Sequence, residues 1–127
     1  MTPAEALAAA VEAGRLEPDA GQARAAERLT ELARAIEAWK GGGRSLFGRT
    51  RPAPCGLYLW GGVGTGKSLM MDFFFESVAL SAKRRVHFHA FMLEVHGRLA
   101  KARVGKGRDP LPGVARAVAR ETRVLCF

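Results

Sequence analysis

Apolar residues recur at helical spacing through the first 39 residues of the sequence. Thr2 and Glu5 predict a capping box, in which the Thr2 hydroxyl accepts an early backbone N–H and the Glu5 carboxylate reaches back. Gly14 suits a left-handed end for this helix, and Asp19 marks the start of a second one. The apolar stripes consist of Ala6, Leu7, Ala10 and Val11, and of Ala25, Ala26, Leu29, Leu32, Ala33, Ile36 and Trp39. The pattern predicts an N-terminal helical hairpin.

A stretch without hydrophobic period follows the hairpin. Residues 40–54, KGGGRSLFGRTRPAP, are rich in Gly, Pro and Arg, which is typical of a connecting segment. Strand-like and helical segments then alternate, with strands predicted over 55–60, 83–91 and 123–127 and helices over 66–81, 92–103 and 114–121. This order predicts the α/β class, with a parallel sheet and covering helices. The sequence thus divides into a helical segment (1–40), a linker (41–54) and an α/β segment (55–127).

Composition narrows the class of protein further. A chain of 127 residues can bury the core of about one domain, and 48% hydrophobic with 25% charged residues is ordinary for a soluble globular protein. The net charge of +8 is compatible with an acidic partner. However, the aromatic residues that alternate with basic ones in single-strand channels are absent. We therefore do not expect a nucleic-acid partner, although a basic nucleic-acid-binding module stays open as an alternative.

The cysteines and the N-terminus indicate a cytoplasmic protein. Cys55 and Cys126 each lie in an apolar run, and one pair does not make a disulfide framework, so two buried, reduced thiols are expected. No apolar run approaches the length of a membrane span. The first residues are acidic and lack the cationic start of a targeting segment.

Residues 61–68, GGVGTGKS, match the phosphate-binding pattern G-x-x-x-x-G-K-[ST] in full. A polyphosphate needs several donors that converge without intervening side chains, and a glycine-rich turn before a helix supplies its backbone N–H groups and the positive end of the helix dipole. Lys67 would reach the β- and γ-phosphates as the catalytic cation, and Ser68 would ligate Mg²⁺. The predicted nucleotide ligands are Gly61, Gly62, Val63, Gly64, Thr65, Gly66, Lys67 and Ser68.

The three histidines offer a second candidate chemistry. His87 and His89 would share one face of the predicted strand 83–91, and His96 follows on the next helix. A His-x-His pair can bind zinc, but no acidic or thiol ligand lies close to it in sequence. Hydrogen bonds to neighbouring layers are the favoured interpretation, and the role of these residues stays open.

Nucleotide hydrolysis by a P-loop protein also needs acidic residues after a later strand, to hold Mg²⁺ and polarise water. The segment RVLCF, residues 123–127, supplies the apolar part of such an element, and the sequence stops where the acid is expected. The other acidic candidates fit poorly: Asp72, Glu76, Glu94 and Asp109 lie on predicted helices or in a Pro-rich loop. We therefore expect a truncated P-loop ATPase domain that is inactive by itself.

Three segments carry a family resemblance: residues 56–76 around GGVGTGKS, residues 83–99 around VHFHAFMLEVH, and residues 109–127, DPLPGVARAVARETRVLCF. Together with the N-terminal helices they resemble the ZapE-type cell-division ATPases and the related AFG-type proteins of the AAA+ group. The resemblance implies that segment 55–127 is the first part of an AAA+-like domain, with the acidic pair, sensors and arginine finger lying further on. It implies ATP and Mg²⁺ as cofactors, a cell-division or membrane-associated protein partner, and an oligomer for the intact protein.

The function expected from these features is Mg²⁺–ATP binding by part of an AAA+ ATPase. A small kinase or GTPase is the alternative that uses the same loop. The sequence lacks the guanine signature Asn-Lys-x-Asp of a GTPase, and no kinase lid or acceptor site is evident.

Overall fold

The computed structural model describes residues 1–39, 51–103 and 107–127. It contains two compact units, residues 1–79 and residues 80–127, which are treated separately below. Most of the predicted linker, 41–54, lies outside the described residues, so its character and the three-segment division of the sequence stay predictions. Within the described ranges, no helix combines the length and the apolar character needed to cross a bilayer.

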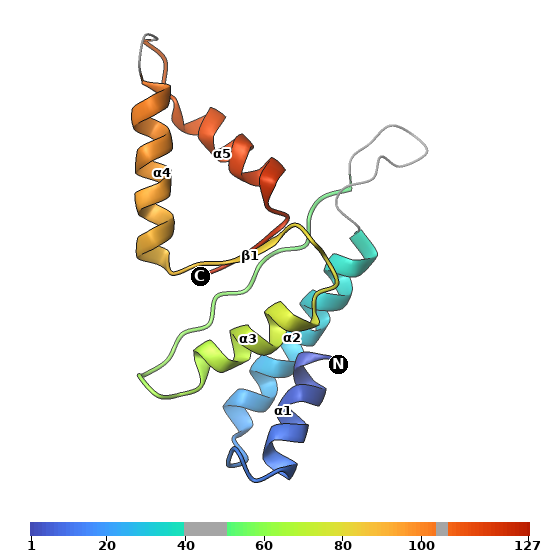
Figure 1. The fold of residues 1–127 in the computed structure, drawn as a ribbon. Helices are drawn as coiled ribbons and strands as arrows, with labels where there is room; N and C mark the ends of the chain where they lie inside the picture. The colour runs from blue at the N-terminus through green and yellow to red at the C-terminus, as the bar shows by residue number, and fades with distance from the viewer. Residues whose placement is uncertain (40–50, 104–106) are drawn as a thin grey trace. The chain divides into compact units, whose positions relative to one another are not determined.

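The first unit consists of three helices packed on one another: α1 (Pro3–Glu12), α2 (Ala20–Trp39) and α3 (Lys67–Ser77) (Figure 1). The predicted capping box is confirmed, because the Thr2 hydroxyl accepts the Glu5 N–H at 3.2 Å and Glu5 accepts the Thr2 N–H at 2.7 Å. Gly14 has the left-handed φ of 69° expected of it. The buried residues of this unit include Pro3, Leu7, Ala10, Ala26, Leu29, Ala33, Ile36, Met70, Phe74 and Val78. The predicted helical hairpin is therefore present, and α3 completes its core.

The buried polar residue Thr30 ties α2 to α1. Its hydroxyl donates to the Ala26 carbonyl at 2.8 Å and accepts the Ala4 N–H at 3.1 Å. Ala4 lies in the first turn of α1, where backbone N–H groups have no partner inside the helix. Thr30 thus satisfies one of these donors and fixes the start of α1 against α2.

The second unit is a short parallel β pair joined by two helices: β1 (Lys83–Arg85), α4 (Phe88–Ala102), α5 (Leu111–Glu121) and β2 (Val124–Cys126). Lys83 pairs with Val124 and Arg85 with Cys126. Parallel strands cannot be joined by a tight turn, and here the crossover runs through α4 and α5, which contact each other (Figure 1). The predicted C-terminal strand is confirmed, and a parallel pairing with helical connections is the part of the predicted α/β architecture that the structure contains.

The strand predicted over residues 55–60 is wrong for this structure, because these residues have no regular secondary structure. Except for the half-buried Leu59, these residues are also exposed, with Tyr58 at 87% and Trp60 at 83% of full exposure. A strand needs a neighbouring strand to pair its backbone groups. In the described part of the chain the sheet has two strands, β1 and β2, and neither includes this segment.

The strand predicted over residues 83–91 is too long. β1 ends at Arg85, and the Phe91 N–H donates to the His87 carbonyl at 2.9 Å, so α4 already begins at Phe88. The rings of Phe88 and Phe91 lie 5.5 and 5.3 Å from that of Phe127. Residues three apart share a helix face, so this aromatic cluster favours helix where the alternation of apolar residues suggested strand.

The prediction of two buried thiols is half right. Cys126 is buried in β2, whereas Cys55 is exposed because it lies in the unpaired segment that was predicted to be a strand. Burial raises the pKa of the Cys126 thiol, since removing a thiolate from water is unfavourable.

Candidate functional site

The segment 61–68 forms an exposed turn that leads directly into α3. Gly64 and Gly66 have φ of 78° and 83°, a left-handed conformation that side chains with a Cβ rarely adopt. Gly66 is also the residue before the first helical turn, and its carbonyl accepts the Met70 N–H at 3.0 Å. The shape of the backbone thus favours glycine at positions 64 and 66.

The Lys67 ammonium lies over the mouth of this turn. It donates to the carbonyls of Gly61 and Gly62, at 2.8 and 2.5 Å, and to the Thr65 hydroxyl at 3.3 Å. Thr65 in turn donates to the Gly62 carbonyl at 2.9 Å. The motif therefore closes on itself around one cation, whose donors are occupied by oxygens of the turn.

The start of α3 adds further donors. In any α-helix the first four N–H groups have no acceptor within the helix, and no side chain of the preceding residue caps them here. The first turn of α3 contains no acidic residue, and its Ser68 side chain is exposed. This arrangement favours an anion, because positive charge and open N–H groups meet at one helix end.

A second helix also contacts the turn. The Gln22 side chain, from the first turn of α2, donates through Nε2 to the Thr65 carbonyl at 3.1 Å. The Gln22 backbone N–H is itself held by the Asp19 carboxylate at 2.7 Å. Sequence reasoning did not identify Gln22, since nothing in the local pattern links positions 43 residues apart.

The structure thus brings together Gly61, Gly62, Thr65 and Lys67 among the predicted site residues, and places Ser68 beside them in the same helix start. The Val63 side chain is fully exposed. The groups around the Lys67 ammonium are two carbonyls and a hydroxyl, so a phosphate would have to replace them as acceptors, and none of these groups is a general base.

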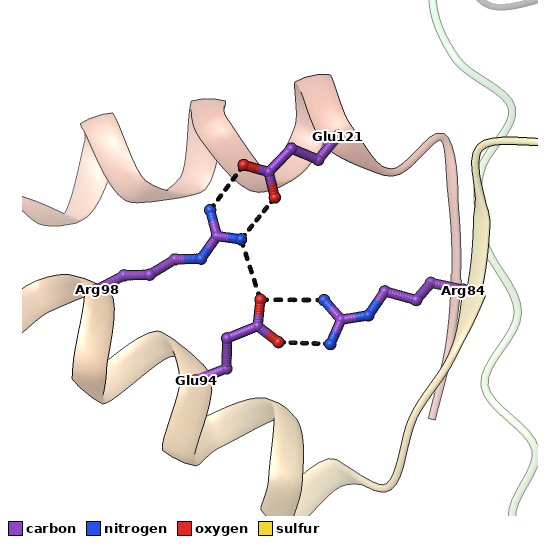
Figure 2. A network of polar contacts seen from close by, with 4 residues as sticks. All are labelled: Arg84, Glu94, Arg98 and Glu121. Atoms are coloured by element: carbon purple, nitrogen blue, oxygen red, sulfur yellow. Dashed lines mark hydrogen bonds and ion pairs between the residues drawn. The ribbon is translucent and has the colours of Figure 1, made fainter.

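A second polar cluster lies in the other compact unit, between β1, α4 and α5. Arg84 donates to both oxygens of Glu94, and Arg98 donates to Glu94 at 3.0 Å and to both oxygens of Glu121 (Figure 2). Arg84 lowers the pKa of Glu94, and Arg98 lowers the pKa of Glu121. These carboxylates raise the pKa of Arg84 and Arg98 in return. All four charges are paired, so the cluster joins three elements and offers no open catalytic group.

The histidines do not form the arrangement that the sequence suggested. His87 precedes α4, whereas His89 and His96 lie within it, so no strand face carries a His-x-His pair. Across residues 1–39, 51–103 and 107–127, no three His, Cys, Asp or Glu residues group as a metal site would require.

Comparison with known proteins shows that the chain belongs to the AFG1-like ATPase family. A sequence model of AFG1-like ATPases matches residues 1–127. The cell division protein ZapE of Escherichia coli K12 is 51% identical over 72 residues, which cover 57% of this chain and 19% of that protein. Lactation elevated protein 1 homolog B of Danio rerio is 46% identical over 83 residues, covering 58% of this chain and 16% of that protein. The alignments therefore span less than a fifth of either relative. No solved structure matches.

Proposed function

Because the chain belongs to the AFG1-like ATPase family, we propose that residues 61–68 bind the phosphates of Mg²⁺–ATP. The observation that carries this proposal is the position of Lys67. Its ammonium donates to three oxygens of the turn, and a phosphate bound on the turn would compete with them for the same donors. The start of α3 adds open backbone N–H groups, and its first turn contains no acidic residue that would repel a phosphate. Family and local geometry thus support the same ligand.

Each predicted ligand has a distinct role in this proposal. Lys67 releases its carbonyl contacts and neutralises the β- and γ-phosphates, which also makes it the residue that would stabilise charge during hydrolysis. The backbone from Gly61 to Gly66 donates N–H groups to the phosphate oxygens. The Ser68 hydroxyl ligates Mg²⁺, which supplies further charge neutralisation when bound.

The role of the whole protein extends this proposal beyond the binding loop. Segment 55–127 would form the first part of an AAA+-like ATPase domain, preceded by the helical segment 1–40. ATP hydrolysis would draw on acidic groups that residues 61–68 do not supply. The name of the Escherichia coli relative, a cell division protein, supports a role in cell division. A protein partner, an oligomeric assembly and a cytoplasmic location complete the proposal.

Titration of the chain with a fluorescent ATP analogue and Mg²⁺ tests the proposal. Lys67→Ala removes charge-assisted hydrogen bonds to phosphate, so the affinity should fall at least about tenfold. Lys101→Ala is the matched control, because it removes the same charge from an exposed site in the last turn of α4. Equal affinity of the wild-type and Lys67→Ala chains would refute the proposal.

Two further titrations address the alternatives. Competition by unlabelled ATP and GTP separates an ATPase from a GTPase, and preferential displacement by GTP would contradict the ATP assignment. DNA binding that weakens with salt and survives Lys67→Ala would favour a basic nucleic-acid-binding module instead.

A further inference from the structure

The Gln22 side chain lies outside segment 61–68 and is hydrogen-bonded to that segment in this structure. Its Nε2 lies 3.1 Å from the Thr65 carbonyl oxygen, and the contact joins the first turn of α2 to the residue before Gly66. The helix behind it is well anchored, because the Asp19 carboxylate caps the Gln22 N–H and α2 packs on both α1 and α3. The side chain therefore reaches the loop from a fixed base.

The orientation of a single peptide unit follows from this contact. The Thr65 carbonyl and the Gly66 N–H belong to the same planar, trans peptide, so they point in opposite directions. A donor that holds the carbonyl on the α2 side therefore turns the N–H toward the other side of the loop. Glycine at position 66 would allow the peptide to flip easily, since glycine tolerates both signs of φ. A flipped peptide would present a carbonyl oxygen to the phosphate, which repels it.

The two ends of the Gln22 carboxamide have different surroundings. Its Oε1 is buried, and within the described residues it has no hydrogen-bond partner. Rotating the amide by half a turn would place Oε1 against the Thr65 carbonyl oxygen and break the one hydrogen bond that the group makes. The donor contact with Thr65 thus decides the orientation of the group.

The Gln22 side chain also approaches Gly66 closely. A Cβ on Gly66 would lie 2.8 Å from Gln22 Nε2 and 3.3 Å from its Cδ, closer than such atoms pack. Gly64 has a similar φ, but a Cβ there would meet no atom within 4 Å. A Cβ at position 66 would therefore displace the Gln22 carboxamide, whereas a Cβ at position 64 would not.

We infer that Gln22 is a positioning residue for the phosphate loop, which holds the Thr65–Gly66 peptide with its N–H available to a phosphate oxygen. The inference rests on the proposed function, since it assigns to Gln22 an effect on nucleotide binding through the loop. Gln22 itself does not touch the phosphate. Its contribution is that of one hydrogen bond that keeps a donor in place.

The sequence provides a unique reporter for this test. Gln22 is the single glutamine, and the chain contains no asparagine, so an ¹H–¹⁵N spectrum of the wild-type chain shows one carboxamide NH₂ pair. Saturating Mg²⁺–ATPγS should shift this pair, because the peptide that Gln22 holds would donate to the nucleotide. In Lys67→Ala the pair should keep its position at the same nucleotide concentration.

Binding measurements on Gln22→Met complete the test. Methionine keeps the length and packing of the side chain but cannot donate, so the affinity for Mg²⁺–ATPγS should fall about three- to tenfold, the effect of one lost hydrogen bond. Arg24→Met is the matched control, because Arg24 is exposed on the same helix. The thermal unfolding midpoints of the nucleotide-free wild-type, Gln22→Met and Arg24→Met chains should be the same. If Gln22→Met unfolds at a lower temperature, the inference is tested instead with Gln22→Glu and with the shift of the wild-type carboxamide signals.

The outcomes separate this inference from the proposed function. Wild-type affinity in Gln22→Met or Gln22→Glu, or a carboxamide pair that saturating nucleotide leaves in place, overturns the inference alone. Failure of the wild-type chain to bind, or binding that Lys67→Ala leaves unchanged, overturns the proposed function and the inference with it. Weaker binding in the Gln22 variants together with a shifted pair supports both.

Discussion

Arg98 donates to both oxygens of the Glu121 carboxylate, at 2.9 and 2.5 Å, and thereby joins α4 to α5. The same guanidinium reaches Glu94, which receives two hydrogen bonds from Arg84 on β1 (Figure 2). Arginine suits this position, because its planar group can serve two carboxylates at once. The cluster therefore links the strand and the helices of the second unit, whose sheet contains few backbone hydrogen bonds of its own.

Replacing Arg98 by lysine should loosen this unit although the charge is kept. A lysine presents one ammonium group, so it cannot bind Glu121 and Glu94 with the same geometry. We expect amide hydrogen exchange to become a few-fold faster at Val86, whose N–H donates to the Cys126 carbonyl at 3.0 Å. Arg120→Lys, at an exposed position of the same unit, is the control and should exchange like the wild-type chain. Unchanged protection in Arg98→Lys would contradict a stabilising role for the cluster.

The stability of the second unit should decrease in acid. Arg84 lowers the pKa of Glu94 in the folded chain, and Arg98 lowers that of Glu121, so both groups bind protons more readily when unfolded. Their contribution is therefore fully present above the unfolded pKa of about 4.3 and is lost as pH falls below it through the folded values. Urea midpoints measured from pH 7 to pH 3 should show this loss.

Glu121→Gln is the matched variant for the acid series. It removes one of the two shifted carboxylates and keeps the side-chain shape, so its midpoint should depend less on pH between 5 and 3 than that of the wild-type chain. Parallel curves for the two proteins would show that the acid sensitivity arises elsewhere.

Local signals in the sequence predicted local features well. The Thr2–Glu5 capping box and the position of the glycine-rich turn before a helix depend on residues within a few positions of one another. The strand predicted for residues 55–60 was wrong, because an apolar run forms a strand only when another strand pairs with it. Gln22 was missed for a related reason, since its contact with Thr65 depends on how α2 packs and leaves no spacing in the sequence.

The two cysteines should differ in their reaction with a thiol reagent. Cys55 is exposed, whereas Cys126 is buried and its pKa is raised by that burial, which lowers the fraction of reactive thiolate. At pH 7.5 we expect Cys55 to be labelled at least about tenfold faster than Cys126. Cys55→Ser should retain the slow phase alone, and denaturant should make the two rates similar. Equal rates in the native chain would contradict the assigned burial.

Alanine at Gly66 should disturb the loop in a way that alanine at Gly64 does not. Both glycines have left-handed φ, so either substitution should lower the free energy of unfolding by about 1–2 kcal/mol. A Cβ at position 66 also meets Gln22 Nε2, which is the mobile end of its side chain and can rotate aside. Gly66→Ala should therefore break the hydrogen bond from Gln22 to Thr65 and move the Gln22 carboxamide signals toward those of an exposed side chain.

Gly64→Ala is the control. It should leave these signals in place, because a Cβ there meets open space. If both variants move the signals equally, the fit between Gln22 and Gly66 does not determine how the loop is held.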